Sequence, residues 1–222
     1  MPRKVAFVTI GQSPRSDVTP EVLAETRSSF DVVERGALDG LTDAEIAALA
    51  PRAGEQRLVS RLKDGREVIL GKPAIDARLH AIFAELDTQD FDLIVLICTG
   101  HFTSFRLRTP FIEPQHLVDH VVQGLAYGKS RIGVVLPNVK QVEEFHGIPG
   151  MEVQVTHASP YAEEGRMERL REAGRELAGT DLIIMHCIGY SEAMRQAVRE
   201  GSGKPVLVSR QIVAHGIDLV LS

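Results

Sequence analysis

The sequence predicts an α/β fold of two similar lobes related by a pseudo-two-fold axis, each with a parallel sheet flanked by helices. Short apolar runs rich in β-branched residues alternate with helical stretches along the 222 residues. The order of these segments in the first half is repeated in the second. Segments 91–101 and 180–190 are near-duplicates, and each reads Asp-Leu-Ile, three more strand-like residues and then Cys-x-Gly.

The first half predicts three strands, three helices and an added β-hairpin near residues 56–70. The hairpin is indicated by Asp64-Gly65, a dipeptide typical of tight turns between strands. A helix is expected after the first strand, with Asp17 or Thr19 as its cap and Pro20 in its first turn. Strands are expected over 4–10 and 30–34, and a third is expected to end at Cys98. Further helices are expected over 42–49, where a Thr-x-x-Glu capping box begins the helix, and over 75–86.

The second half predicts the same alternation. Strands are expected over 131–136, 152–156, 182–187 and 204–209, and helices over 139–145, 162–178 and 211–221. Because the last strand and helix are expected to return to the first lobe, we predict lobes of residues 1–112 plus 205–222 and residues 113–204.

Composition argues against several classes of partner. The net charge is -5, the aromatic content is 5% and tryptophan is absent, so neither a basic nucleic-acid surface nor a base-stacking platform is expected. No apolar run approaches a membrane span, and the first residues do not resemble a signal peptide. We therefore expect a cytoplasmic protein whose two cysteines are reduced rather than bridged. Association into a homo-oligomer is left open.

The candidate site lies where the predicted strands end, because ligands of parallel sheets bind outside the carboxyl ends of the strands. If the lobes face each other, these loops meet in one cleft with a thiol on each side. The expected catalytic residues are Cys98 and Cys187. The expected substrate-binding residues are Gln12, Ser13, Arg15, Thr99, Gly100, His101, Pro137, Asn138, Ile188, Gly189, Tyr190, Ser209 and Arg210.

Two opposed thiols suit removal of a proton from one face of a carbon acid and its return to the other face. An unperturbed thiol has a pKa near 8.5, so a modest shift yields a thiolate near neutral pH. His101 is the better neighbour for this tuning, because His186 alternates with Cys187 along its strand and should point to the other side. Backbone amides beside the two glycines and the hydroxyls of Ser13 and Thr99 are expected to bind the substrate carboxylate.

Other interpretations of these residues stay open. Both cysteines can be small buried hydrophobic residues, although two at matched positions weigh against this. Zinc binding by cysteines and histidines is disfavoured because no close Cys-x-x-Cys or His-x-x-x-His spacing occurs. No phosphate-binding loop or Gly-x-Gly-x-x-Gly segment occurs either, so no cofactor is expected. Arg15 is either a carboxylate clamp or an ordinary surface arginine, and we favour an exposed loop for Arg106 and Arg108.

Four segments together resemble the AroM protein family over essentially the whole chain. They are residues 10–15 (Ile-Gly-Gln-Ser-Pro-Arg), 36–41 (Gly-Ala-Leu-Asp-Gly-Leu), 62–68 (Leu-Lys-Asp-Gly-Arg-Glu-Val) and 98–100 (Cys-Thr-Gly). More distantly, a cysteine in each half resembles the aspartate/glutamate/hydantoin racemase superfamily, which includes cofactor-independent racemases, maleate isomerase and arylmalonate decarboxylase. This resemblance implies that Cys98 and Cys187 are the catalytic thiols and that Ser13 and Thr99 lie near the substrate.

The chain departs from that superfamily at two places. Ile188 follows the second cysteine where a polar residue is common, and Gln12 replaces an acidic group often found after the first strand. The expected function is a cofactor-independent racemase or isomerase of a small carboxylate-bearing compound. The alternatives are a one-thiol isomerase or decarboxylase-type lyase, and a non-catalytic carboxylate-binding or regulatory protein.

Overall fold

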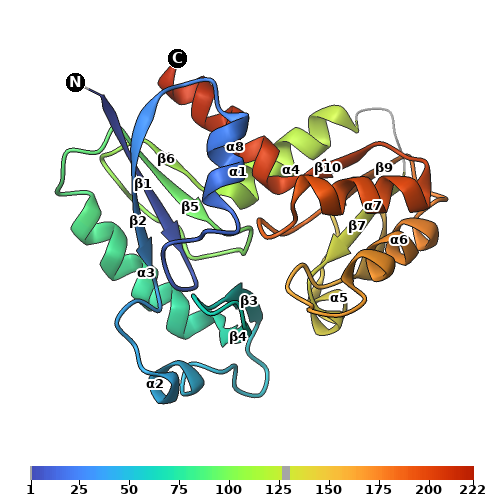
Figure 1. The fold of residues 1–222 in the computed structure, drawn as a ribbon, viewed down its shortest axis with the longest axis horizontal. Helices are drawn as coiled ribbons and strands as arrows, with labels where there is room; N and C mark the ends of the chain where they lie inside the picture. Colours follow the sequence, from blue (N-terminus) through green and yellow to red (C-terminus); the bar gives the residue numbers. More distant parts are fainter. Residues whose placement is uncertain (1, 127–130) are drawn as a thin grey trace. The chain divides into compact units, whose positions relative to one another are not determined.

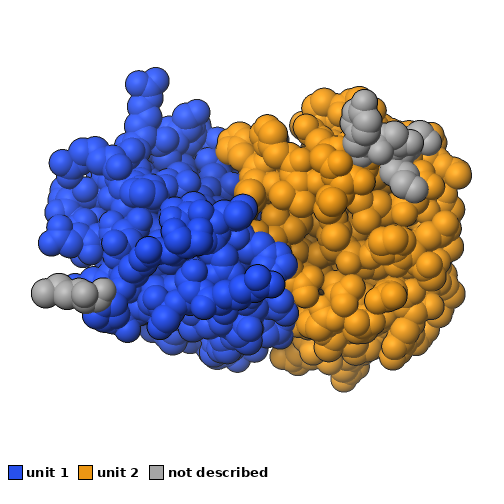
Figure 2. All heavy atoms as spheres, turned by 90° about the horizontal axis from the view of Figure 1, so that it is seen from above, with its two compact units in different colours: residues 1–115, 213–222 blue, residues 116–212 orange. Residues whose placement is uncertain are grey.

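The computed structural model describes residues 2–126 and 131–222. The chain divides into two compact units, which Figure 2 shows in different colours. Unit 1 comprises Met1–Gln115 and Val213–Ser222, and unit 2 comprises His116–Ile212. Both units are α/β, with parallel sheets flanked by helices, so the expected fold class is confirmed.

Unit 1 is built on a four-stranded sheet in the order β2-β1-β5-β6, in which every pair is parallel (Figure 1). Its strands are β1 (Arg3–Thr9), β2 (Phe30–Gly36), β5 (Leu93–Ile97) and β6 (Phe111–Ile112), and its helices include α1 (Thr19–Glu25), α2 (Asp43–Ala47) and α3 (Lys72–Leu86). The expected hairpin is present as the antiparallel pair β3 (Arg57–Arg61) and β4 (Glu67–Gly71).

Unit 2 contains a second four-stranded parallel sheet, in the order β10-β9-β7-β8. Its strands are β7 (Arg131–Leu136), β8 (Glu152–His157), β9 (Leu182–Met185) and β10 (Val206–Val208). The helices are α4 (Pro114–Leu125), α5 (Val139–Glu144), α6 (Arg166–Glu176), α7 (Glu192–Ser202) and α8 (Ser209–Leu221), of which α8 ends in unit 1.

The two sheets have the same topology. Strands β2, β1, β5 and β6 correspond in order to β8, β7, β9 and β10. In each sheet, the first strand along the chain is therefore flanked by the second and third strands of that same sheet. The near-duplicate segments form the equivalent strands β5 and β9. The repeated order of elements seen in the sequence is therefore a repeated fold.

The aspartate of each duplicate segment ties its strand to the start of the central strand. In unit 1, the backbone N–H of Lys4 donates to Oδ2 of Asp92 at 2.7 Å, and the N–H of Asp92 donates to the carbonyl of Lys4 at 2.9 Å. In unit 2, Arg131 and Asp181 make the same two contacts, at 3.4 and 3.0 Å. The shared aspartate thus sets the register of both central pairs.

Helices cover the sheet of unit 2 on both faces, as the alternation of side chains along a strand requires. One core cluster joins Ile183 and Met185 of β9 to apolar residues of α6 and α7. The cluster on the other face joins Leu182 and Ile184 to Val118 and Val122 of α4 and to their neighbours. In unit 1, the buried residues of α3 form the core with alternate residues of β1 and β5; they are Ile75, Leu79, Phe83 and Leu86.

Two helix starts differ from the sequence-based expectation. Helix α1 has Val18 at its N-cap, with no side-chain cap, because the carboxylate of Asp17 is bound by a neighbouring arginine instead. Helix α6 begins only at Arg166, since Gly165 precedes it in the left-handed conformation with φ of 64°. The capping box at Thr42 and Glu45 is confirmed.

Three elements were not foreseen: β6, α4 and α7. Strand β6 is only two residues long, too short for a period to be recognised.

Among the residues that the structure describes, no helix is long and apolar enough to cross a membrane.

Helices α6 and α7 approach each other closely at two glycines. A Cβ atom on Gly174 would lie 2.3 Å from the carbonyl oxygen of Val198, and one on Gly201 would lie 2.1 Å from that of Arg171. Both neighbouring atoms are backbone and cannot move without shifting a helix. The contact between these helices therefore requires glycine at both positions.

We predict that Gly201→Ala destabilises the protein by about 1–3 kcal/mol, because the added methyl group overpacks the helix contact. Gly124→Ala is the matched control, since Gly124 is also helical but nothing lies within 4 Å of its added Cβ atom. There, alanine should be neutral or stabilise by up to about 1 kcal/mol. Urea unfolding of both variants measures the difference, and equal effects would contradict the close contact.

Candidate active site

The two cysteines end equivalent strands and make the same contact. Cys98 directly follows β5, and Cys187 comes two residues after the end of β9. The backbone N–H of Gly100 donates to Sγ of Cys98 at 3.3 Å, and that of Gly189 donates to Sγ of Cys187 at 3.4 Å. A donor aimed at sulfur stabilises negative charge there. Each Cys-x-Gly segment therefore provides its thiol with a built-in partner for a thiolate.

Glycine is required in both segments because another group lies against it. A Cβ atom on Gly100 would lie 2.8 Å from Cδ2 of Leu58, on the hairpin strand β3. One on Gly189 would lie 2.4 Å from the hydroxyl oxygen of Tyr161, in the segment between β8 and α6. The two strand-end loops are thus packed against elements that come from elsewhere in their own unit.

Both thiols are largely buried, and neither cysteine forms a disulfide. The exposed fraction is 8% for Cys98 and 7% for Cys187. Cys98 belongs to the core cluster that includes α3, and Cys187 to the cluster that includes α6 and α7. Each sulfur therefore has apolar neighbours from the core and a polar donor from its own loop.

The neighbouring histidines lie in different settings. His101 is exposed. The ring of His186 lies 3.9 Å from a carboxylate oxygen of Asp119 on α4, and α4 packs on the opposite face of the sheet from the cluster that contains Cys187. His186 thus points away from the thiol that follows it, as expected from the alternation along a strand.

The loop after β1 is held by a carboxylate that the sequence analysis did not assign. Asp39 accepts hydrogen bonds from the backbone N–H of Ser13 at 2.8 Å, the hydroxyl of Ser13 at 2.5 Å and the backbone N–H of Gly36 at 2.8 Å. Since the Ser13 proton is directed at Asp39, the hydroxyl oxygen offers acceptor rather than donor capacity to a ligand. In the sequence, Asp39 was singled out only as part of the Gly-Ala-Leu-Asp-Gly-Leu segment that resembles the AroM family.

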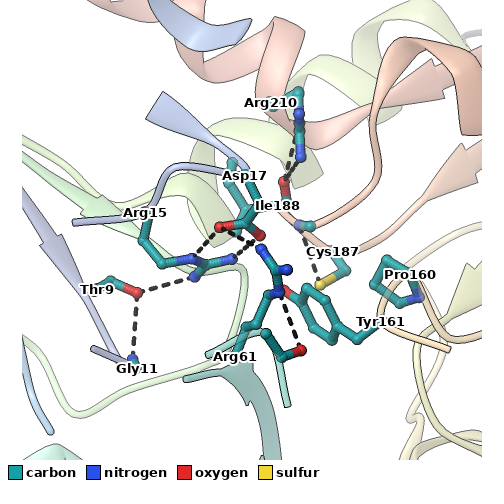
Figure 3. A network of polar contacts seen from close by, with 12 residues as sticks. Thr9, Gly11, Arg15, Asp17, Arg61, Pro160, Tyr161, Cys187, Ile188 and Arg210 are labelled. Atoms are coloured by element: carbon teal, nitrogen blue, oxygen red, sulfur yellow. Dashed lines mark hydrogen bonds and ion pairs between the residues drawn. The ribbon is translucent and has the colours of Figure 1, made fainter. Parts of the chain in front are cut away.

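Arg15 is buried and its guanidinium is bound by groups of the protein itself (Figure 3). Nε and Nη2 each donate to one oxygen of Asp17 at 2.8 Å, and Nη1 donates to the hydroxyl of Thr9 at 3.0 Å. Burial raises the pKa of Asp17, but the hydrogen bonds and charge of Arg15 outweigh this, and the pKa lies below its usual value of 3.8. The fork that was expected to clamp a substrate carboxylate holds this internal carboxylate.

The hairpin packs directly on the loop after β1. A Cβ atom on Gly11 would lie 2.4 Å from Oγ of Ser60 and 2.6 Å from the carbonyl oxygen of Arg61. The side-chain oxygen of Gln12 accepts a hydrogen bond from the backbone N–H of Lys63 at 2.9 Å. The guanidinium of Arg61 lies 3.9 Å from Asp17 (Figure 3). Gln12 therefore connects the hairpin to the loop that carries Ser13.

In unit 2, three of the expected site residues bond to backbone carbonyls. The hydroxyl of Tyr190 donates to Ala158 at 2.7 Å, and that of Ser209 donates to Met185 at 3.1 Å. Arg210 is buried, and its Nε and Nη2 donate to the carbonyl of Ile188 at 3.1 and 3.0 Å (Figure 3). These contacts hold the Cys187 loop in place, and a direct contact with substrate stays a prediction.

The remaining expected residues lie at the same strand ends. Thr99 and Ile188 are buried within the two Cys-x-Gly segments. Pro137 is buried after β7, and the side-chain oxygen of Asn138 accepts from the N–H of Lys140 at 2.9 Å as the cap of α5. Within unit 1, the loops after the neighbouring strands β1 and β5 thus emerge at one edge. The loops after β7, β9 and β10 do so within unit 2.

No group of three or more histidine, cysteine, aspartate or glutamate side chains is placed to hold a metal ion in the described part of the chain.

The profile of the AroM family, described as AroM protein, matches residues 5–221. The chain belongs to the AroM family. This match covers both units and includes all the segments from which the resemblance was inferred. No curated protein sequence matches the chain.

Solved structures show the same fold at low sequence identity. The maleate isomerase Iso from Pseudomonas putida S16 is 16% identical, with a TM-score of 0.58 over 99% of this chain and 92% of that one. Unliganded arylmalonate decarboxylase is 13% identical, with a TM-score of 0.58 and the same coverage. Glutamate racemase isoform RacE1 from Bacillus anthracis is 12% identical, with a TM-score of 0.59 over 99% of this chain and 81% of that one. The AroM chain therefore has the fold of the Asp/Glu racemase group.

We predict that Asp17→Asn destabilises the protein by on the order of 3 kcal/mol at neutral pH, because the buried guanidinium of Arg15 loses its charged partner. The pKa of Asp17 is lowered in the folded protein, so its stabilising contribution is complete well above 3.8 and is lost as the pH falls below that value. Unfolding free energies of both proteins between pH 3 and pH 7 measure this. A difference that does not shrink toward low pH would contradict the ion pair.

Proposed function

We propose that this AroM-family protein is a cofactor-independent racemase or isomerase of a small carboxylate-bearing compound, with Cys98 and Cys187 as its acid and base. The observation that carries the proposal is the matched pair of strand ends. Each has a thiol whose sulfur accepts a backbone N–H from the glycine two residues later. Equivalent groups in duplicated units suit a reaction that treats the two faces of one carbon in the same way.

In the proposed reaction, one cysteine is a thiolate and the other a thiol. The thiolate takes the proton from the carbon next to the substrate carboxylate, and the electron pair of the broken C–H bond moves into the carboxylate as an enediolate. The other thiol then gives its proton to the opposite face of the carbon, and its sulfur becomes the thiolate. Protons and charge balance, and the two cysteines exchange roles with each turnover.

Stabilising the enediolate requires donors that are already aimed at its oxygens. Nε and Nη2 of Arg15 donate to Asp17, and the hydroxyl of Ser13 donates to Asp39. The donors proposed for the substrate carboxylate are the hydroxyl of Thr99 and the backbone amides of the strand-end loops.

The known activities of structurally similar proteins support this class of reaction. By their names, these proteins are a maleate isomerase, an arylmalonate decarboxylase and glutamate, aspartate and allantoin racemases. The likeness to these proteins establishes the fold. The proposal for the reaction rests on the two thiols of this chain.

A second candidate uses only one thiol, as a nucleophile or single-face proton donor in an isomerisation or decarboxylation. The observation that favours it is the difference between the two loops. The segment Thr99-Gly100-His101 includes a hydroxyl and an exposed imidazole, whereas Ile188-Gly189-Tyr190 is buried throughout. A third candidate is a protein that binds a carboxylate without turnover.

We predict that the protein exchanges α-protons in heavy water with at least one member of a panel of amino acids, hydantoins and aromatic or dicarboxylic acids. Loss of a general acid or base costs about 100-fold or more. Cys98→Ala and Cys187→Ala should each therefore abolish racemisation of the substrate identified. NMR follows the exchange, and chiral chromatography follows the racemisation.

The two cysteine variants separate the candidates. One-thiol chemistry predicts that one of the two variants keeps its activity. Carboxylate-induced thermal stabilisation without exchange, together with ordinary alkylation rates of both thiols, would favour the binding protein. If no compound exchanges and Cys98→Ala behaves like the parent protein in every assay, the two-base proposal is wrong.

A further inference from the structure

The hairpin strand β3 packs on both of the loops that lie at the site edge of unit 1. A Cβ atom on Gly100 would lie 2.8 Å from Cδ2 of Leu58, and the N–H of this glycine donates to Sγ of Cys98. Three residues further along β3, the carbonyl oxygen of Arg61 lies 2.6 Å from the place of a Cβ atom on Gly11, in the loop after β1. Strand β3 therefore brings Arg61 to the edge of the sheet at which Cys98 lies.

Two contacts hold the guanidinium of Arg61 at this edge (Figure 3). Nε donates to the carbonyl of Gly65 in the hairpin turn at 3.1 Å, and Nη1 lies 3.9 Å from Oδ1 of Asp17. The second distance is too long for a hydrogen bond. Both oxygens of Asp17 already accept from Arg15 at 2.8 Å. Asp17 therefore places the second guanidinium by charge, without taking up its donors.

Most of the donors of Arg61 are available to a ligand. A guanidinium has five N–H groups, and that of Nε is bonded to the hairpin turn. The four N–H groups of Nη1 and Nη2 form no hydrogen bond within residues 2–126 and 131–222. The exposed fraction of the side chain is 33% for Arg61 and 3% for Arg15. A planar pair of donors that is open to solvent matches the two oxygens of a carboxylate.

We propose that Arg61 is a substrate-binding residue, which donates from Nη1 and Nη2 to the carboxylate of the compound that meets Cys98. The inference rests on the proposed function for the reacting thiol and for the carboxylate of the ligand. The negative charge on that carboxylate grows as the α-proton leaves, and a guanidinium that is already held in place stabilises this charge. The hairpin added to the α/β fold thereby supplies the cationic partner of the substrate, in addition to Thr99 and the backbone amides.

The test is an NMR titration of the full chain with succinate and phenylacetate, and with succinamide and phenylacetamide as their neutral counterparts. The backbone N–H signals of Gly11 and Gly100 report binding at the two loops. We expect at least one acid to bind more tightly than its amide, and Arg61→Gln to raise the Kd of that acid by about tenfold or more, the size of a lost hydrogen bond to a charged group. Arg61→Lys keeps the charge without the planar pair of donors and should recover part of the affinity.

Arg66→Gln is the matched control, because it removes the same charge from the same hairpin. The guanidinium of Arg66 donates to Asp64 at 2.7 Å and to Asp43 at 3.3 Å, so we expect the Kd to stay unchanged in this variant.

Three results would overturn the proposal: no binding of either acid to the parent protein, an unchanged Kd in Arg61→Gln, or an equal rise of the Kd in Arg61→Gln and Arg66→Gln. The titration needs no turnover. An acid that binds through Arg61 without any α-proton exchange across the panel therefore counts against the proposed function alone. Exchange together with an unchanged Kd in Arg61→Gln counts against the role of Arg61 alone.

Discussion

Each sheet depends on one parallel pair of central strands whose register is set at its beginning by an aspartate. Asp92 bonds to the backbone of Lys4, and Asp181 bonds to that of Arg131 in the same way. With the starts aligned, the paired strands end at the same edge of the sheet, where backbone and side chains are available for a ligand. The position of each thiol follows from a carboxylate six residues before it in the sequence.

The strand ends show why the Cys-x-Gly sequence occurs twice. The cysteine supplies the sulfur, and the glycine supplies an N–H donor to that sulfur together with the space for a neighbouring group. The neighbours differ, since Leu58 of the hairpin lies on Gly100 and Tyr161 lies on Gly189. The two segments therefore share a local geometry, but the group that packs on the glycine is aliphatic in unit 1 and phenolic in unit 2.

Polar residues that look alike in the sequence divide into those that support the loops and those that remain candidates for substrate contact. Arg15, Ser209 and Arg210 are buried, and their hydrogen bonds named above go to Asp17, Thr9 and backbone carbonyls. A buried guanidinium needs such partners because an unpaired charge is costly inside a protein. These contacts hold the loop after β1 and the loop after β9, and the thiol of Cys187 lies in the second of these loops.

The sequence by itself determined the α/β class, the duplication, the hairpin at Asp64-Gly65 and the location of both cysteines at strand ends. These features follow from local patterns: the alternation of apolar runs, a turn dipeptide and a repeated segment. Only the tertiary structure decided that Asp17 binds Arg15, that Asp39 binds Ser13 and that Tyr161 covers Gly189. Such pairs join residues through the folded backbone, and the choice of partner depends on distance, burial and charge rather than on spacing along the chain.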